Sequence, residues 1–176
     1  MPARTAVSIF VTMVTITINK ALVLDEVAKT TSYIGAKASD DGTLYEHIFT
    51  TDEDRVMLER FWLEACSVLT DALRPWLLSV DAQTPSTEYS LSNNYVAVLG
   101  MPGNWDTALE GSVNESLFAY MANSIVAKWF LFTAKEEAET YATVASGMLS
   151  DATGKLYSRK RPSRPEYADE SPTPDE

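Results

Sequence analysis

The chain has 176 residues, the length of one domain, and 45% of them are hydrophobic, which is enough for a buried core. Its formal net charge of −11 argues against general nucleic-acid binding, because an acidic chain repels phosphate backbones. The only cysteine, Cys66, excludes an intramolecular disulfide, and the only histidine, His47, excludes the usual zinc sites and leaves no spare base for a nucleophilic triad.

The first predicted element is a strand. The sequence VTITIN, which begins at residue 14, alternates β-branched aliphatic residues with threonines, a pattern typical of a half-buried strand. A cleaved signal peptide is the alternative, because an apolar run follows Arg4. Met13 offers a second start site, in which case residues 1–12 would be an N-terminal extension.

Two helices are expected next. Residues 21–37 show helical spacing of apolar residues, and Gly35 is expected to end or bend this helix. Thr51 is a good N-cap for a second helix, and the acids at 52–54 suit its first turn better than a metal site. Pro75 should end or kink that helix near Arg74. Its apolar face comprises Leu58, Phe61, Trp62, Ala65, Leu69, Ala72, Leu73 and Trp76.

Residues 79–104 lose the helical period. EYSLS (88–92) and NYVAVL (94–99) are predicted as short strands, and GMPGN (100–104) as a turn. We therefore expect a hairpin near residues 88–100, which could pair with the N-terminal strand.

The second half of the chain predicts two more helices. SVNE at 112–115 and TAKE at 133–136 both fit a capping box, with Ser112 and Thr133 as N-caps. Thr133 marks either a tight corner between two helices or a kink in one, and we favour the corner. Residues 117–132 are too short and too interrupted by polar residues for a membrane span. They are apolar on more than one face, which is typical of a helix buried from two sides.

We expect one side of this helix to meet the helices at 52–78 and 134–157. The other side should meet the β element or another subunit. The last helix has an alanine-rich face, which predicts close packing against a neighbouring helix. That face comprises Ala138, Tyr141, Ala142, Ala145, Met148, Leu149, Ala152 and Leu156.

The composition changes abruptly at residue 159. Residues 1–158 are predicted to form a single helical domain, and residues 159–176 a proline-rich charged tail. This tail is either a disordered solubilising segment or an extended arm that lies along a partner. The fold class expected is therefore mainly α: a small helical bundle with a short β element and an extended C-terminal arm.

The sequence contains no fingerprint of an enzyme. Gly-x-Ser-x-Gly, nucleotide-binding and nicotinamide-binding patterns are absent, and no pair of carboxylates stands out from the others. We therefore expect a non-enzymatic protein without a cofactor or a metal. Aromatic and arginine side chains are enriched at protein interfaces. The candidate interface residues are Trp105, Trp129 (which could equally be core), Arg159, Lys160, Arg161, Arg164 and Tyr167.

The order of these elements resembles the small helical connector, or neck, proteins of tailed phages. The segments EVAKTTSYIGAK, FTTDEDR, ERFWLEA and KWFLFTAKEEAETY are also similar to an uncharacterised group of phage and prophage proteins from gut bacteria. The resemblance spans about residues 14–165 and carries over no functional residue.

The resemblance implies a structural protein of the virion, assembled in the host cytoplasm. Such a protein would form a homo-oligomeric ring between portal and tail and would contact other virion proteins. The long acidic, proline-rich tail departs from the pattern and leaves its partner open. A bacterial cytosolic adaptor or regulator built as a small helical bundle is the main alternative, and an enzyme with an unrecognised site is a third.

Overall fold

The computed structural model describes residues 11–38, 50–81 and 93–161, and the statements below concern these residues. Within them the chain is mainly helical with one small antiparallel sheet, as predicted. In chain order the main elements are β1 (Val11–Ile18), α1 (Lys20–Ala38), α3 (Arg55–Leu73), β2 (Leu77–Val80), β3 (Tyr95–Pro102), α4 (Glu110–Thr133) and α5 (Lys135–Tyr157). Short 3₁₀ helices, η1 (Asp52–Asp54) and η2 (Thr107–Leu109), precede α3 and α4.

The sheet has the strand order β1-β3-β2, with both neighbours antiparallel to β3. The expected N-terminal strand is therefore confirmed, and its alternation holds, since Val14, Ile16 and Ile18 are buried. NYVAVL falls in β3, whereas EYSLS lies outside the described residues. The second partner of β3 is β2 (Leu77–Val80), which was not predicted because the helix expected at 52–78 included its first two residues.

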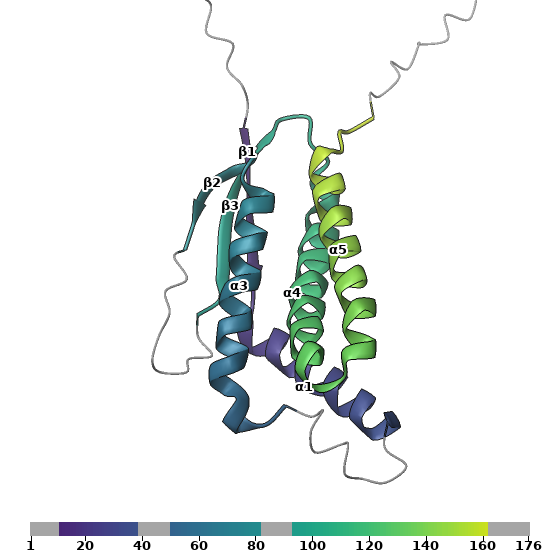
Figure 1. Ribbon diagram of the computed structural model, residues 1–176. Coiled ribbons are helices and arrows are strands. Elements are labelled where there is room, and N and C mark those ends of the chain that lie inside the picture. Colours follow the sequence, from purple (N-terminus) through teal and green to yellow (C-terminus); the bar gives the residue numbers. More distant parts are fainter. Residues whose placement is uncertain (1–10, 39–49, 82–92, 162–176) are drawn as a thin grey trace, which may run out of the picture.

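Helix α4 lies at the centre of the fold and contacts α1, α3, α5 and β1 (Figure 1). The prediction that this helix is buried from two sides is confirmed, because it meets both helices and the sheet. None of the described helices is long and apolar enough to cross a membrane. The buried apolar side chains of all these elements form one cluster.

Two predicted helix boundaries are correct. The backbone N–H of Thr51 donates to Asp54 Oδ2 at 2.7 Å, and the Thr51 hydroxyl lies 2.9 Å from the same oxygen. This capping interaction opens η1 and the α3 helix behind it. At the other end, α3 stops at Leu73 with Arg74 as its C-cap, one residue before Pro75.

Other boundaries were predicted wrongly. Helix α1 runs through Gly35 to Ala38, because glycine lowers helix stability without preventing helical backbone. Ser112 lies inside α4, which starts at Glu110 behind η2. The cap of η2 is Asp106, whose carboxylate accepts from the backbone N–H of Ala108 at 3.1 Å.

The corner between the last two helices is confirmed, but Thr133 is not its cap. Ala134 separates α4 from α5 with φ −150° and ψ 68°, outside helical values. The Thr133 hydroxyl donates back to the Trp129 carbonyl at 3.1 Å and so belongs to the end of α4. Trp76, expected on the α3 face, lies beyond that helix, where its ring meets Tyr157 edge to face at 4.7 Å.

Candidate functional site

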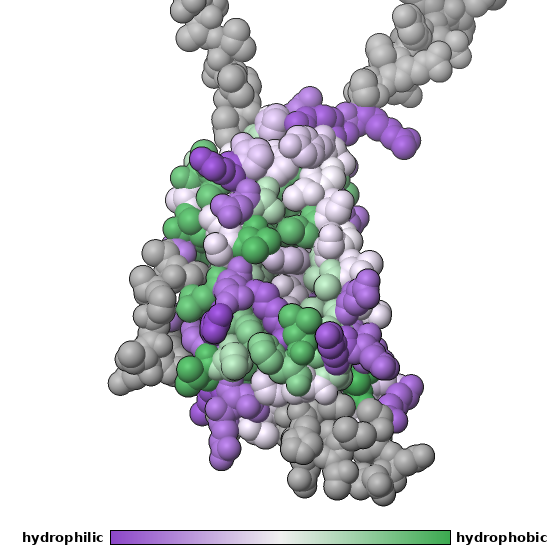
Figure 2. All heavy atoms as spheres, in the orientation of Figure 1, coloured by the Kyte–Doolittle hydropathy of each residue, from purple (hydrophilic) through white to green (hydrophobic). Residues whose placement is uncertain are grey.

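An apolar groove of about 530 Å³ runs between α3 and α5, with α4 as its floor. Figure 2 looks onto this face, where apolar (green) and weakly polar (pale) residues lie between the two helices together with some hydrophilic (purple) ones. The apolar side chains that line it are Val68, Ala127, Leu131, Ala138, Ala142, Ala145 and Leu149. Because the walls are mostly apolar, the groove suits a hydrophobic side chain or helix better than a charged small molecule.

The groove exists because one of its walls is built from small residues. Ala138, Ala145 and Ala152 are buried and recur every seven residues along α5, so this stripe faces α4. The predicted close packing of the alanine-rich face is confirmed for these residues, whereas Ala142 is exposed. Small side chains let α5 approach α4 closely, and they leave the space toward α3 unfilled.

Two half-exposed side chains stand on the margins of the groove. Val68 of α3 is 49% exposed and Leu131 of α4 is 59% exposed. Next to Leu131, Phe132 is 71% exposed and stacks on Phe61, with the two ring centroids 6.3 Å apart. The apolar surface therefore continues from the groove onto the end of α4. Exposed apolar patches of this kind mark interaction sites in soluble proteins.

A polar contact joins α4 to α3 beside the groove. Lys128 Nζ lies 2.6 Å from Glu64 Oε2, and Arg60 Nε lies 3.0 Å from Glu64 Oε1. The hydrogen bond from Lys128, followed by that from Arg60, lowers the pKa of Glu64. Since Val68 lies one helical turn after Glu64, this contact fixes the α3 wall of the groove relative to its floor.

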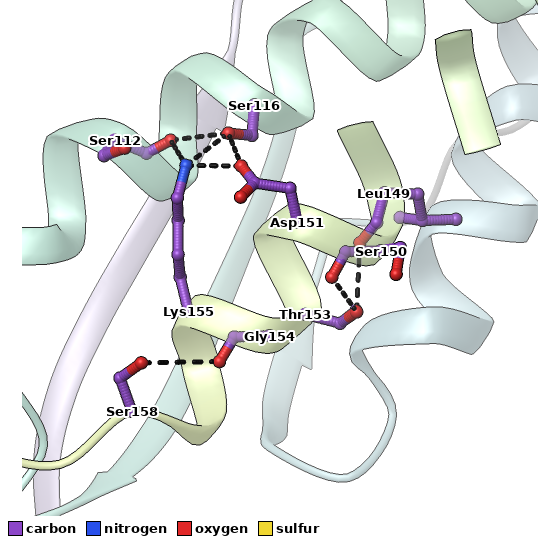
Figure 3. A network of polar contacts seen from close by, with 9 residues as sticks. All are labelled: Ser112, Ser116, Leu149, Ser150, Asp151, Thr153, Gly154, Lys155 and Ser158. Atoms are coloured by element: carbon purple, nitrogen blue, oxygen red, sulfur yellow. Dashed lines mark hydrogen bonds and ion pairs between the residues drawn. The ribbon is translucent and has the colours of Figure 1, made fainter. Parts of the chain in front are cut away.

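A second polar network joins the first turns of α4 to the last turns of α5 (Figure 3). Ser116 Oγ lies 2.7 Å from an Asp151 carboxylate oxygen and 2.9 Å from Lys155 Nζ, and Lys155 also pairs with Asp151. The hydrogen bonds from Lys155 and then Ser116 lower the pKa of Asp151.

The Ser116–Lys155 pair has the spacing of a serine nucleophile and its lysine base, but its surroundings do not favour that chemistry. A base must offer a lone pair to the hydroxyl proton. The Lys155 ammonium instead donates to the Asp151 carboxylate and to Ser116. Ser116 is buried, and its proton has acceptors at Asp151 and at the Ser112 carbonyl, 2.9 Å away. We therefore interpret this network as a clamp between two helices.

One charged pair lies inside the core. Lys20 is fully buried; its ammonium pairs with Glu59 and lies 5.8 Å from the centroid of the Trp62 ring. The backbone N–H of Lys20 donates to the Asn94 side chain at 3.2 Å, so the pair anchors the start of α1 to α3 and to the residue before β3. Sequence reasoning missed it, because a lysine at a strand-to-helix junction normally points to solvent.

The predicted interface tryptophans are placed in the core. Trp105 is 1% exposed, and its ring N–H donates to the Lys155 carbonyl at 3.1 Å. Trp129 is 8% exposed, in line with its alternative interpretation as core. Both rings belong to the buried core cluster, so this fold does not present them on its surface, and their role at an interface stays a prediction.

The basic residues have a different placement. Arg159, Lys160 and Arg161 are exposed just after α5. Arg159 Nη1 donates to the carbonyls of Tyr157 and Ser158, each at 2.9 Å, and Lys160 N–H donates to the Asn104 carbonyl at 2.8 Å. The structure thus ties the start of the predicted tail to the turn after β3. Arg164, Tyr167 and His47 lie outside the described residues.

The groove residues Val68 and Leu131 were not among the predicted site residues. The signal was present in the sequence, since Val68 lies off the apolar face of its helix and Leu131 precedes the corner at Ala134. An apolar side chain that lies off the core face of its helix, or next to a corner between helices, is left available for another contact. No group of three or more metal-binding side chains occurs in residues 11–38, 50–81 and 93–161.

Comparisons of the chain with protein-family models, curated proteins and solved structures gave no match.

Proposed function

We propose that this chain is a non-enzymatic structural protein of a tailed-phage virion, a head-to-tail connector that forms a ring and bridges portal and tail. The observation that carries the proposal is the apolar groove between α3 and α5, with Val68 and Leu131 half exposed on its margins. Such a surface suits a permanent protein contact, because water covers it poorly until a partner arrives. The order of elements, which resembles that of connector proteins, supports the same conclusion.

In this proposal the groove receives an apolar segment of the neighbouring subunit. A contact between two different surfaces of identical chains is heterologous, and such contacts close into rings when the rotation between neighbours permits it. The floor and walls are pre-formed, since the Lys128–Glu64 contact and the α4–α5 packing fix their positions without a partner. A pre-formed surface lowers the ordering cost of association.

The decisive experiment measures the mass of the purified protein by light scattering, alone and with added portal protein. Wild-type protein is expected to form a discrete ring, and Val68→Glu or Leu131→Glu to abolish the ring. Val144→Glu is the matched control, because Val144 is also exposed (39%) but does not line the groove. A strict monomer at high concentration that ignores portal protein would support the cytosolic adaptor instead.

Electron microscopy of particles that contain the chain tests the location. The proposal expects density for the chain between the portal and the tail. Density for the chain elsewhere in the particle would contradict the proposal.

A further inference from the structure

Strand β1 has a long edge that no described strand pairs with. Among residues 11–38, 50–81 and 93–161, the sheet order β1-β3-β2 leaves one side of β1 without a strand, and all eight residues of β1 pair with β3 in unbroken register from Val11–Pro102 to Ile18–Tyr95. The other edge strand, β2, has four residues and an irregular register between Leu77 and Ser79. Short length and bulges protect an edge from further pairing, so β2 is the protected edge and β1 the open one.

The backbone groups that face this edge can be assigned from the bonds of β3. Gly100 N–H donates to the Trp76 carbonyl at 2.8 Å, and the Val96 carbonyl accepts from Asp81 N–H at 3.0 Å. Residues 96, 98 and 100 thus direct their backbone groups toward β2. Since direction alternates along a strand, residues 97, 99 and 101 direct theirs toward β1.

The same alternation then sets β1. Residues 97 and 99 pair with Ile16 and Val14, which therefore use their N–H and C=O groups on β3. Met13, Thr15 and Thr17 must direct their N–H and C=O groups away from the sheet. Among the described residues, no backbone hydrogen bond beyond the strand ladder uses these groups. The side chains of all three are exposed as well.

Nothing in the sequence of β1 blocks another strand from pairing here. VTMVTITI contains no charged residue, no proline and no glycine, and its register with β3 has no bulge. Proteins usually discourage edge pairing with one of these devices. An edge without them, in a chain that otherwise carries a net charge of −11, is a surface on which two copies can meet without bringing carboxylates together.

We propose that β1 pairs with β1 of a second copy of this chain, antiparallel and with its two-fold axis at Thr15. This register places Thr15 opposite Thr15 and Met13 opposite Thr17, so the outward backbone groups of these three residues find partners. Cross-strand threonine pairs stabilise such a contact. The lack of charge in β1 and its self-complementary pattern of outward backbone groups favour a second copy over a charged peptide as the occupant.

This contact is independent of the proposed ring. Pairing of a surface with itself is isologous and closes after two copies, whereas a ring requires a heterologous contact such as the groove. The two can therefore fail separately. Val68→Glu tests the groove, and the variants below test the β1 edge.

The test is residue-specific hydrogen exchange together with sedimentation of the full chain. In wild-type protein the amides of Met13, Thr15 and Thr17 should exchange at least about tenfold more slowly at high than at low concentration, since pairing protects them. The amides of Val14 and Ile16 face β3 and serve as internal controls, protected at both concentrations. Fast exchange at 13, 15 and 17 at every concentration would overturn the proposal.

A proline variant isolates the edge. Thr15→Pro removes an outward N–H and no bond to β3, a position at which strands tolerate proline. We expect it to fold and to lose β1-mediated pairing, whereas Thr15→Val, which keeps the N–H, should still pair. If Thr15→Pro does not fold, Thr15→Lys with Thr17→Lys places like charges across the same edge and should give the same loss. Unchanged pairing in a folded proline or lysine variant would contradict the proposal, as would protection that appears only with a different protein.

Discussion

The ammonium of Lys20 pairs with the carboxylate of Glu59 inside the apolar core, where Lys20 has no solvent exposure. The pair connects the β1–α1 junction to the second turn of α3, two parts of the chain that no strand ladder joins. Burying both charges costs desolvation free energy that their attraction only partly offsets. The contribution of the Lys20–Glu59 pair to the free energy of unfolding is therefore largest in a variant that lacks only one of the two partners.

Lys20→Met should lower the free energy of unfolding by about 3–5 kcal/mol, because Glu59 would remain as an uncompensated buried charge. Lys20→Met combined with Glu59→Leu should recover most of this loss. The matched control is Lys29→Met, since the Lys29–Asp25 pair is exposed to solvent and its loss should change the free energy of unfolding far less. Urea denaturation followed by circular dichroism measures all three. A double variant no more stable than Lys20→Met alone would contradict the prediction.

The thiol of Cys66 should be unreactive in the folded protein. Burial raises the pKa of Cys66 from 9.0 to about 12, so almost no thiolate is present at pH 8. Alkylation by iodoacetamide, followed by mass spectrometry, should be slow in buffer and fast in urea. Rapid modification of the native chain would show that the core opens at this position.

The same shift predicts lower stability in alkaline solution. Above pH 9 the unfolded chain loses the Cys66 proton while the folded chain keeps it, so the free energy of unfolding should fall as pH rises toward 12. The slope from one such proton is at most about 1.4 kcal/mol per pH unit. Burial also raises the pKa of Tyr95 and Tyr120, which adds to the slope above pH 10. Cys66→Ala should make the slope between pH 9 and 10 shallower, and an unchanged slope would contradict this assignment.

The packing of α5 on α4 should be sensitive to side-chain size at the buried alanines alone. Ala152→Leu should cost about 1–3 kcal/mol, because a fully buried alanine leaves no room for added methylene groups. Ala142→Leu on the same helix is the control, since Ala142 is exposed and its replacement should change stability by less than about 0.5 kcal/mol. Thermal unfolding compares the two. Equal effects would mean that the alanine stripe does not set the distance between these helices.

Two aromatic residues near the end of α4 should respond differently to a charge. Trp129→Glu should abolish folding, because Trp129 is 8% exposed within the core. Phe132→Glu should leave the fold intact, since Phe132 is 71% exposed. Circular dichroism measures whether each variant folds, and light scattering measures whether it assembles. A folded Trp129→Glu protein that fails to assemble would show that the core and interface faces of α4 are reversed.

The parts of the fold that were predictable are those that local chemistry determines. Thr51 and Pro75 mark the limits of a helix by a capping interaction and a missing N–H, and both effects act within a few residues. Ser112 has the same capping chemistry, yet the helix begins earlier, because Asp106 and η2 already supply a start. Two competing caps only six residues apart, Asp106 and Ser112, cannot be ranked without the surrounding packing.

The candidate surfaces were less predictable because they depend on contacts between distant segments. Trp105 was predicted as an interface anchor from its residue type, but its ring is buried and donates its N–H to the last turn of α5. Val68 became a groove residue only through the separation of α3 from α5 above α4. Strand β2 was missed since its four residues acquire strand geometry from pairing with β3.

The pairing of β1 with β3 has a consequence for synthesis of the chain on the ribosome. Val11 finds its partner at Pro102, so β1 stays without this neighbour until the residues up to Pro102 have been made. An uncharged β-branched segment that waits unpaired is prone to aggregate. We therefore expect that the yield of soluble protein depends on the delay between translation of β1 and of β3. Slowing translation between them should divert chains into inclusion bodies, and a chaperone that holds extended apolar segments should rescue them.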